Sequence, residues 1–209
     1  NGMTVESITP VGTRKCKVLF DEGFALVLYR GEVKRYGIEE KKDLPLETYE
    51  EIVENVLFKR AKERVVHLLK SMDRTEAELR RKLAEGGYPK AAQDFALEYV
   101  KKMGYVDDEA YARRYAECFS DRKSSRQIAC DLQRKGVERE IVAAVMEETE
   151  VDEDRQIEKL LEKRGYFKKR EGGWDSPEAA AKEYQKAAAF LARKGFSWDA
   201  ICRVMGCRD

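Results

Sequence analysis

The chain has 209 residues, enough for one domain or two small ones, and 39% of its residues are charged. Its abundance of Ala, Glu, Lys, Arg and Leu, with only four prolines, is typical of helical proteins. The formal net charge of +1 neither indicates nor excludes a polyanionic partner, and no apolar stretch approaches the roughly 20 residues of a membrane span.

The N-terminal segment differs from the rest, because its apolar residues follow the alternation of β-strands. Lys15–Phe20 and Phe24–Tyr29, separated by the turn residues Asp21-Glu22-Gly23, predict a β-hairpin. Further short strands are predicted at Thr4–Ile8 and Val33–Tyr36. A lone hairpin is marginally stable in water, so we expect this one to pack on the following helix or on a partner.

From about residue 46 the apolar residues take helical spacing. The segment Leu46–Met72 predicts one long helix, or two helices joined near Phe58–Arg60. Thr75 and Glu78 then match a capping box, which predicts the start of a second helix that ends at Gly86-Gly87.

A third helix and a tight joint follow. Pro89 suits the first turn of a helix, and Gly104 suits the left-handed conformation that ends one. Asp107 or Asp108 is placed to cap the next helix, where a negative charge favours the helix dipole. We interpret this stretch as a joint between two similar units.

A second unit of three helices is predicted after the joint. Its helices are expected at about residues 108–122, after a cap at Ser124 or Ser125, and around Ile141–Met146. A looser third unit follows, with these predicted features: a helix near 152–165, a loop Phe167–Asp175, a helix from the cap Ser176-Pro177-Glu178 to Gly195, and a short helix capped by Ser197.

The three units share one register, which makes the repeat testable. Leucine precedes glycine by four positions in each unit, at Leu83–Gly87, Leu132–Gly136 and Leu191–Gly195. Apolar residues lie directly after each glycine and nine positions after it: Tyr88, Val137 and Phe196, then Ala96, Val145 and Val204. This period of roughly 50–60 residues predicts tandem repeats in an elongated, curved, mainly α-helical array. The predicted parts are 1–45, 46–104, 105–150 and 151–209.

The sequence offers little for catalysis or metal binding. His67 is the only histidine, and its apolar neighbours predict a partly buried, structural residue. Nucleophile-elbow, phosphate-loop, dinucleotide and HExxH motifs are absent from the sequence. Asp107-Asp108-Glu109 is explained better by helix capping than by a metal ion. We therefore expect a protein that is not an enzyme and has no cofactor.

The cysteines and the N-terminal residues bear on the compartment. The five cysteines are scattered without a CxxC pair, which favours a reducing environment over a disulfide framework or a zinc site. Cys202 and Cys207 are the one close pair, and we interpret them as an apolar residue and a tail residue. Without a signal-peptide core, we expect a cytoplasmic protein.

Basic clusters are the remaining candidates for a binding site. Residues 57–102 carry a net charge of +5 and residues 151–209 carry +2, whereas residues 1–56 and 103–150 each carry −3. The candidate partner- or DNA-binding residues are Arg80, Arg81, Lys82, Arg113, Arg114, Arg122, Lys123, Arg126, Arg134, Lys135, Lys168, Lys169 and Arg170.

These clusters have two further interpretations. Three-helix units with a basic second helix invite a helix-turn-helix hypothesis, although no base-reading side chains stand out. Alternatively, the charges only keep the helix faces solvated. Tyr99, Tyr105, Tyr111 and Tyr115 are expected to pack rather than to stack on bases.

The joint carries a family resemblance. Gly104–Arg113 resembles the segment glycine, two hydrophobic residues, Asp-Asp and then Phe/Tyr-Ala of the RecX family, regulators of the RecA recombinase, and Glu78–Leu83 and Ile128–Val137 match further. The resemblance covers residues 57–150 well, and the N-terminal hairpin is similar to an extension in some members. The third unit departs from the pattern through its insert at Phe167–Asp175.

The resemblance implies binding in the groove of the RecA nucleoprotein filament, with inhibition of ATP hydrolysis and strand exchange in recombination and SOS repair. It also implies weak affinity for single- or double-stranded DNA. The alternatives are a DNA-binding protein that acts alone through its basic clusters, and a helical scaffold for another partner. We expect a monomer, because the helix faces are used internally.

Overall fold

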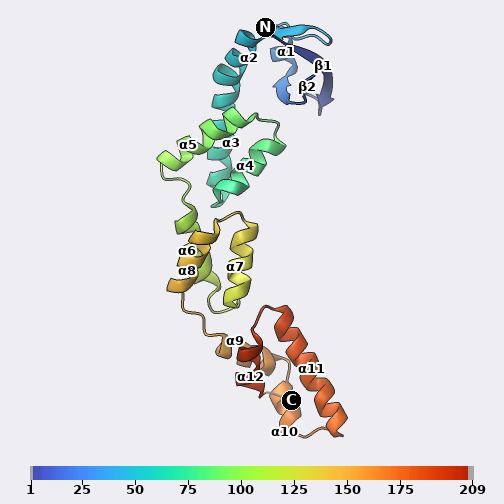
Figure 1. Cartoon of the computed structure of the whole chain (residues 1–209), viewed down its shortest axis with the longest axis vertical. Coiled ribbons are helices and arrows are strands. Elements are labelled where there is room, and N and C mark those ends of the chain that lie inside the picture. Colours follow the sequence, from blue (N-terminus) through green and yellow to red (C-terminus); the bar gives the residue numbers. More distant parts are fainter. Residues whose placement is uncertain (1, 207–209) are drawn as a thin grey trace. The chain divides into compact units, whose positions relative to one another are not determined.

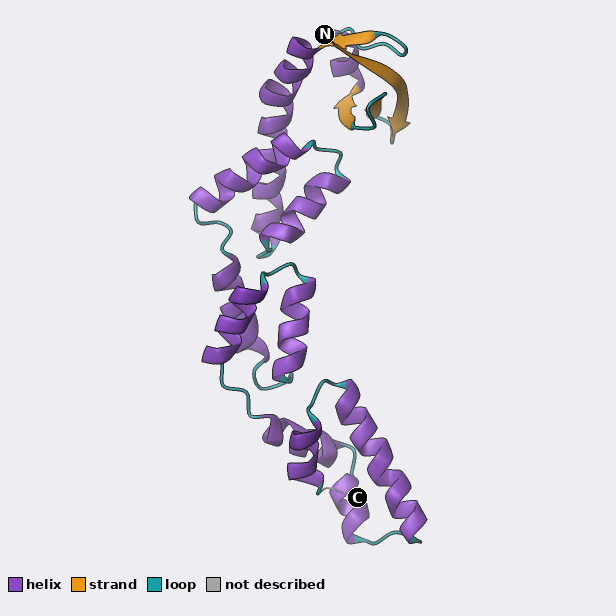
Figure 2. Cartoon of the chain, viewed as in Figure 1, coloured by secondary structure: helices purple, strands orange, loops and turns teal. Residues whose placement is uncertain are grey.

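The structure is a computed structural model of the chain, and it describes residues 2–206. The chain divides into two compact units, residues 1–107 and 108–209 (Figure 1). Helices form most of both units, and the strands of the described chain lie in the first unit (orange in Figure 2). The predicted mainly α-helical fold with a small N-terminal sheet is therefore confirmed.

Four antiparallel strands form the sheet of the first unit, in the order β3-β2-β1-β4. Their bounds are β1 Gly2–Val11, β2 Lys15–Phe20, β3 Ala25–Tyr29 and β4 Asp43–Pro45. The predicted hairpin is confirmed as β2–β3, and β1 contains the predicted strand Thr4–Ile8. Strand β4, which pairs with the start of β1, is too short for an alternating pattern and was not expected.

The predicted strand at Val33–Tyr36 is wrong, because this segment belongs to helix α1, Arg30–Arg35. The Glu32 carboxylate stabilises the first turn by accepting a hydrogen bond from the Tyr29 N–H (2.8 Å). The same carboxylate accepts from Arg60 Nη2 at 2.6 Å. Burial acts to raise the pKa of Glu32, but Arg60 and the Tyr29 N–H outweigh it and hold the pKa below its ordinary value.

The long helix from residue 46 is continuous but contains one irregular turn. It comprises α2 (Leu46–Ile52), a π-helical turn (Val53–Leu57) and α3 (Phe58–Ser71). Backbone dihedral angles stay helical at Val53 and Phe58, so the chain does not break between these parts. The irregularity lies just before the predicted joint at Phe58–Arg60.

Helices α4 (Glu76–Glu85) and α5 (Lys90–Lys102) complete the first three-helix bundle. The capping box is confirmed, since the Glu78 N–H donates to Thr75 Oγ1 and the Thr75 N–H donates to Glu78 Oε1, each at 3.1 Å. Pro89 is the N-cap residue of α5 rather than part of its first turn.

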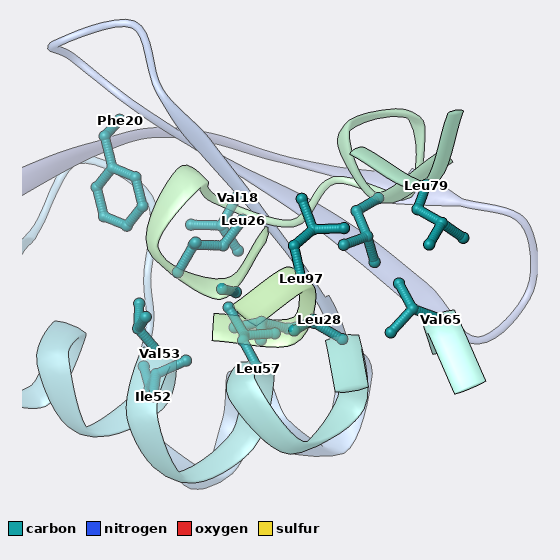
Figure 3. Close-up of a cluster of buried hydrophobic side chains, with 14 of the residues drawn as sticks. Val18, Phe20, Leu26, Leu28, Ile52, Val53, Leu57, Val65, Leu79 and Leu97 are labelled. Atoms are coloured by element: carbon teal, nitrogen blue, oxygen red, sulfur yellow. The ribbon is translucent and has the colours of Figure 1, made fainter. Parts of the chain in front are cut away.

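The sheet and the first bundle share one hydrophobic core. Figure 3 shows Val18 and Leu26 of the sheet above Ile52 and Leu57 of the long helix, with Leu97 of α5 beside them. All five side chains are 0–2% exposed. The hairpin therefore packs on the following helix, which is one of the two expected outcomes.

Seven helices form the second unit within the described residues. The first three are α6 (Asp108–Phe119), α7 (Ser125–Arg134) and α8 (Arg139–Glu148). The remaining four are α9 (Glu153–Lys163), α10 (Tyr166–Glu171), α11 (Pro177–Arg193) and α12 (Trp198–Met205). The predicted serine caps are confirmed at Ser124, Ser176 and Ser197, whose hydroxyls each accept a backbone N–H three residues on.

The predicted loop Phe167–Asp175 is wrong in its first half, which forms helix α10. This helix begins after Gly165, whose φ is +73°. Tyr166 is 7% exposed and its ring lies 6.3 Å from that of Trp174. Aromatic packing thus orders a segment whose basic residues and following glycines favour a loop.

The repeat register is confirmed in atomic detail at the three Leu–Gly turns. Gly87, Gly136 and Gly195 have φ values of +81°, +86° and +95°. In each turn the N–H after the glycine donates to the leucine carbonyl, at distances of 3.1 to 3.2 Å. This is the hydrogen bond of the Schellman motif, and it ends the second helix in the first two units and α11 in the third.

Two predictions about single side chains are wrong. His67 is exposed rather than partly buried, because it points away from the buried face of α3. Tyr105 is 51% exposed rather than packed. Cys16, Cys118, Cys130 and Cys202 are free thiols, and Cys207 lies outside the described residues.

Candidate partner-binding surfaces

Contacts between the α6–α8 bundle and the following helices fix the turn before α7. Gln156 of α9 is 4% exposed, and its Nε2 donates to the carbonyls of Ser120 and Lys123, each at 2.9 Å. Glu153 Oε1 accepts the N–H of Ser125 at 3.0 Å. A basic turn is thereby held in place by a neighbouring helix.

Lys123, in this turn, is bound to an acid of its own bundle. Its Nζ lies 2.7 Å from Asp131 Oδ2 and 3.0 Å from the Tyr115 hydroxyl, which itself donates to Asp131 at 2.7 Å. Burial acts to lower the pKa of Lys123, but the hydrogen bonds with Asp131 and Tyr115 outweigh it and raise the pKa. Lys123 therefore contributes charge mainly to internal structure.

Arg122, by contrast, presents its charge to solvent. Its Nη2 donates to the carbonyl of Cys118 at 3.1 Å, and its guanidinium lies 4.8 Å from the centre of the Phe119 ring. The neighbouring Asp121 carboxylate is 3.6 Å from Arg122 Nε, and both side chains are more than 60% exposed. Such an exposed pair contributes little and leaves the guanidinium available.

The predicted cluster on α4 is not uniform. Arg80 Nη1 forms an ion pair with Asp94 Oδ1 at 2.8 Å, which links α4 to α5. Arg81 Nε lies as far as 4.0 Å from Glu85 Oε1, and both side chains are exposed, so this ion pair is weak. Lys82 forms no ion pair with any described residue. Arg81 and Lys82 are the available members of this cluster.

The cluster on α6 and α7 divides in the same way. Arg113 lies 2.7 Å from Glu109 and 3.6 Å from Glu148. Arg126 and Arg134, in contrast, are exposed on α7 and have no ion pair within residues 2–206. The remaining two predicted residues are Arg114, which is exposed on α6, and Lys135, whose Nζ lies 5.9 Å from the Tyr115 ring centre.

The cluster Lys168, Lys169 and Arg170 lies on α10 rather than in a loop, and all three side chains are exposed. The Arg170 guanidinium lies 5.2 Å from the ring centre of Phe167. Lys169 lines a pocket of about 460 Å³ together with Lys182 and Lys186 of α11.

Four basic residues near these clusters were missed: Lys182, Lys186, Arg193 and Lys194. The predicted clusters were found because their basic residues are neighbours in the sequence. The four missed residues lie near those clusters only in the folded chain. One signal was available, because Arg-Lys-Gly recurs at residues 134–136 and 193–195, at the same place in the repeat.

No cluster of three or more Cys, His, Asp or Glu side chains is arranged to hold a metal ion within residues 2–206. None of the described helices is both long enough and apolar enough to cross a bilayer.

Comparison with known proteins places all three bundles in one family. Residues 61–99 match the first three-helix domain of RecX, residues 107–146 match the second, and residues 152–205 match the third. The third match includes α10, so the apparent insert does not remove this bundle from the series.

Similar proteins cover nearly the whole chain. Regulatory protein RecX of Caldanaerobacter subterraneus subsp. tengcongensis is 31% identical over 91% of this chain and 92% of its own length. Regulatory protein RecX of Clostridium perfringens (strain 13 / Type A) is 29% identical over 88% of this chain and 85% of its own length.

A solved structure supports the fold. A crystal structure of regulatory protein RecX has a TM-score of 0.60 and 19% identity, covering 97% of this chain and 98% of that one. With three domain matches in the order of the chain, and curated relatives along most of its length, the chain belongs to the RecX family.

Proposed function

We propose that this protein regulates the RecA recombinase by binding along the groove of the RecA–DNA filament, where it limits ATP hydrolysis and strand exchange during recombination and SOS repair. The observation that carries this proposal is the series of three RecX-domain matches at residues 61–99, 107–146 and 152–205. The curated relatives bear the name regulatory protein.

The surface supports action by binding rather than by catalysis. Small repeated bundles offer extended surfaces instead of one deep pocket. Among the thirteen predicted residues, those that are exposed or half-buried without an acidic partner among the described residues suit a filament interface best: Lys82, Arg126, Arg134, Lys168, Lys169 and Arg170. We further propose that the protein acts as a monomer in the cytoplasm.

The test is RecA's DNA-dependent ATP hydrolysis, measured while this protein is titrated in, with binding to bare DNA as the control. Inhibition at concentrations well below those that coat bare DNA supports a filament regulator. Inhibition only where bare DNA is already covered means competition for DNA and contradicts the proposal.

An interface variant sharpens the test. Arg81→Glu/Lys82→Glu should weaken filament binding, because it reverses two available charges on α4 without breaking the Arg80–Asp94 ion pair. The matched control is Lys70→Glu/Lys90→Glu, two exposed lysines of the same unit with the same change in charge. Equal affinities for the two variants would remove α4 from the interface.

A second candidate function is direct DNA binding. It is favoured by Arg126 and Arg134, which are exposed on α7 without ion pairs to described residues. A protein that neutralises phosphates loses affinity steeply as salt rises. A steep salt dependence on bare DNA, with no added affinity for the filament, would favour this function over the first.

A further inference from the structure

A pocket of about 410 Å³ in the second unit is lined on both sides by cations. One side is the turn between α6 and α7, and the other is the end of α11 with the turn that follows it. The residues that matter here are Arg122 and Lys123 on the first side, Arg193 and Lys194 on the second, and the rings of Phe119 and Phe196. None of the residues that line this pocket is acidic.

Direct contacts hold the two sides together. The Ser124 hydroxyl is fully buried and lies 3.4 Å from the carbonyl of Lys194, to which it donates. A Cβ built on Gly195 would lie 2.8 Å from the Ser124 Oγ, so the two turns approach as closely as a residue without a side chain allows. Backbone packing therefore fixes the two turns that carry these cations next to each other.

Three of the four cations remain available for a ligand. Lys123 is neutralised by Asp131 at 2.7 Å. Arg193 and Lys194 are exposed and form no ion pair with any residue from 2 to 206. The ion pair of Arg122 with Asp121 is exposed on both sides and neutralises its charge only weakly. Three uncompensated charges around one pocket suit a multiply charged anion better than a single carboxylate.

The aromatic rings favour phosphates over bases. The Lys123 Nζ lies 4.2 Å and the Arg122 guanidinium 4.8 Å from the centre of the Phe119 ring, so cations already occupy this ring. Phe196 is 4% exposed. Neither ring is free to stack on a base, which is the usual route to single-strand recognition.

We propose that this pocket binds phosphate groups, supplied by a free polyphosphate or by the backbone of a nucleic-acid strand, without reading the base. Arg122, Arg193 and Lys194 attract the phosphate groups, and the ion pair between Lys123 and Asp131 holds the turn between α6 and α7 in place. The site stands on the pocket alone and does not depend on the proposed regulation of RecA.

The experiment uses the full chain and no other protein. Labelled oligothymidylate and oligoadenylate are titrated at several salt concentrations, with Arg193→Ala/Lys194→Ala as the test variant. Its affinity for both should fall by about tenfold at roughly 0.1 M salt, and the slope of log affinity against log salt should fall in magnitude by about 1.4, since each cation removed accounts for about 0.7 on a single strand. The charge-conserving Arg193→Lys/Lys194→Arg variant should retain most of the affinity.

The matched control is Arg139→Ala/Lys163→Ala, which removes two exposed cations of the same unit away from this pocket. An equal loss of affinity in this control would overturn the proposal, because the attraction would then be general charge. A strong preference for one of the two oligonucleotides would also overturn it, since base recognition would be required.

A second measurement separates the sources of phosphate. Calorimetry with tripolyphosphate, ATP and AMP should show saturable binding of the first two that Arg193→Ala/Lys194→Ala abolishes, if free polyphosphate is a ligand. Binding of oligonucleotides alone, lost in the same variant, assigns the pocket to a strand. The proposal is overturned if neither polyphosphates nor oligonucleotides bind. It is also overturned if polyglutamate binds more strongly than they do, because the pocket would then be assigned to an acidic polypeptide.

Discussion

Gly195 and Ser124 are packed so closely that a Cβ on the glycine would lie 2.8 Å from the serine Oγ. The two residues are 71 positions apart, yet both belong to the recurring turns of the repeat: Ser124 caps α7, and Gly195 ends the turn after α11. In the first unit, Gly87 takes the corresponding place in its own bundle and faces Val27 of strand β3. The glycine turn of the first bundle thus packs against the sheet, whereas the glycine turn of the third bundle packs against the N-cap of α7.

Replacement of Gly195 by alanine should destabilise the second unit by roughly 2–3 kcal/mol. The φ of +95° is unfavourable for alanine, and the added methyl group must displace Ser124. Gly165→Ala is the matched control, since Gly165 has a φ of +73° with nothing within 4 Å of its Cβ. Denaturant unfolding measures both, and equal losses would show that the contact with Ser124 contributes nothing.

Replacement of Gly87 by alanine should destabilise the first unit by a similar amount, about 2–3 kcal/mol. The new Cβ would overlap Val27 Cγ2 and lie 2.9 Å from Val27 Cβ, and a β-branched side chain has little freedom to move. Val27→Ala should relieve part of the cost, which a double-mutant cycle would detect as coupling. Additive losses would contradict this contact.

Replacement of Gln156 should uncouple α9 from the turn before α7. Gln156→Leu leaves the carbonyls of Ser120 and Lys123 without their donor, at a cost of about 2 kcal/mol. Gln156→Glu should cost more, because a carboxylate would face the same two carbonyl oxygens. Thermal unfolding of both variants checks this order, and a glutamate variant as stable as the native protein would contradict it.

The Tyr115–Lys123–Asp131 network should make stability depend on pH at both extremes. Burial acts to raise the pKa of Asp131, but Lys123, Tyr115 and Gln127 outweigh it and hold the pKa below its ordinary value. The charged carboxylate therefore favours the folded state, and its contribution is present above the ordinary pKa of 3.8 and lost as pH falls through the lower folded-state value.

At alkaline pH the network's contribution to stability falls as the pH rises. Burial and the hydrogen bond with Asp131 raise the pKa of Tyr115, and the pKa of Lys123 is also raised. Their contributions are present below the ordinary tyrosine pKa of 10.0 and are lost as pH rises through the folded-state values. Asp131→Asn should flatten the acid side of the stability profile, and an unchanged acid side would show that other carboxylates dominate it.

Most of the fold could be predicted because its signals are local. The spacing from leucine to glycine, the serine caps and the capping box at Thr75 each lie within a few residues, and each sets a helix end directly. Helix α1 could not be predicted in this way, because Glu32 is stabilised by Arg60, which is 28 positions away. Helix α10 depends similarly on Tyr166 packing near Trp174.

The candidate surfaces were harder to predict than the fold, because a basic side chain is available to a partner only if the folded chain places no acidic residue beside it. Arg80 and Arg81 are adjacent in sequence, but Arg80 pairs with Asp94 of the next helix while Arg81 faces solvent. Arg193 lies far from Arg122 in the chain, and both line one pocket only because Gly195 packs on Ser124.

The π-helical turn at Val53–Leu57 sets the phase of the long helix. A π turn holds one residue more than an α turn, as if a single residue had been inserted. The helix can therefore direct Ile52 to the sheet and, further on, Val65 to α4 and α5, both fully buried. Deleting one residue within this turn would restore a regular α-helix and rotate one half against the other, so sheet and bundle would no longer share a common interior.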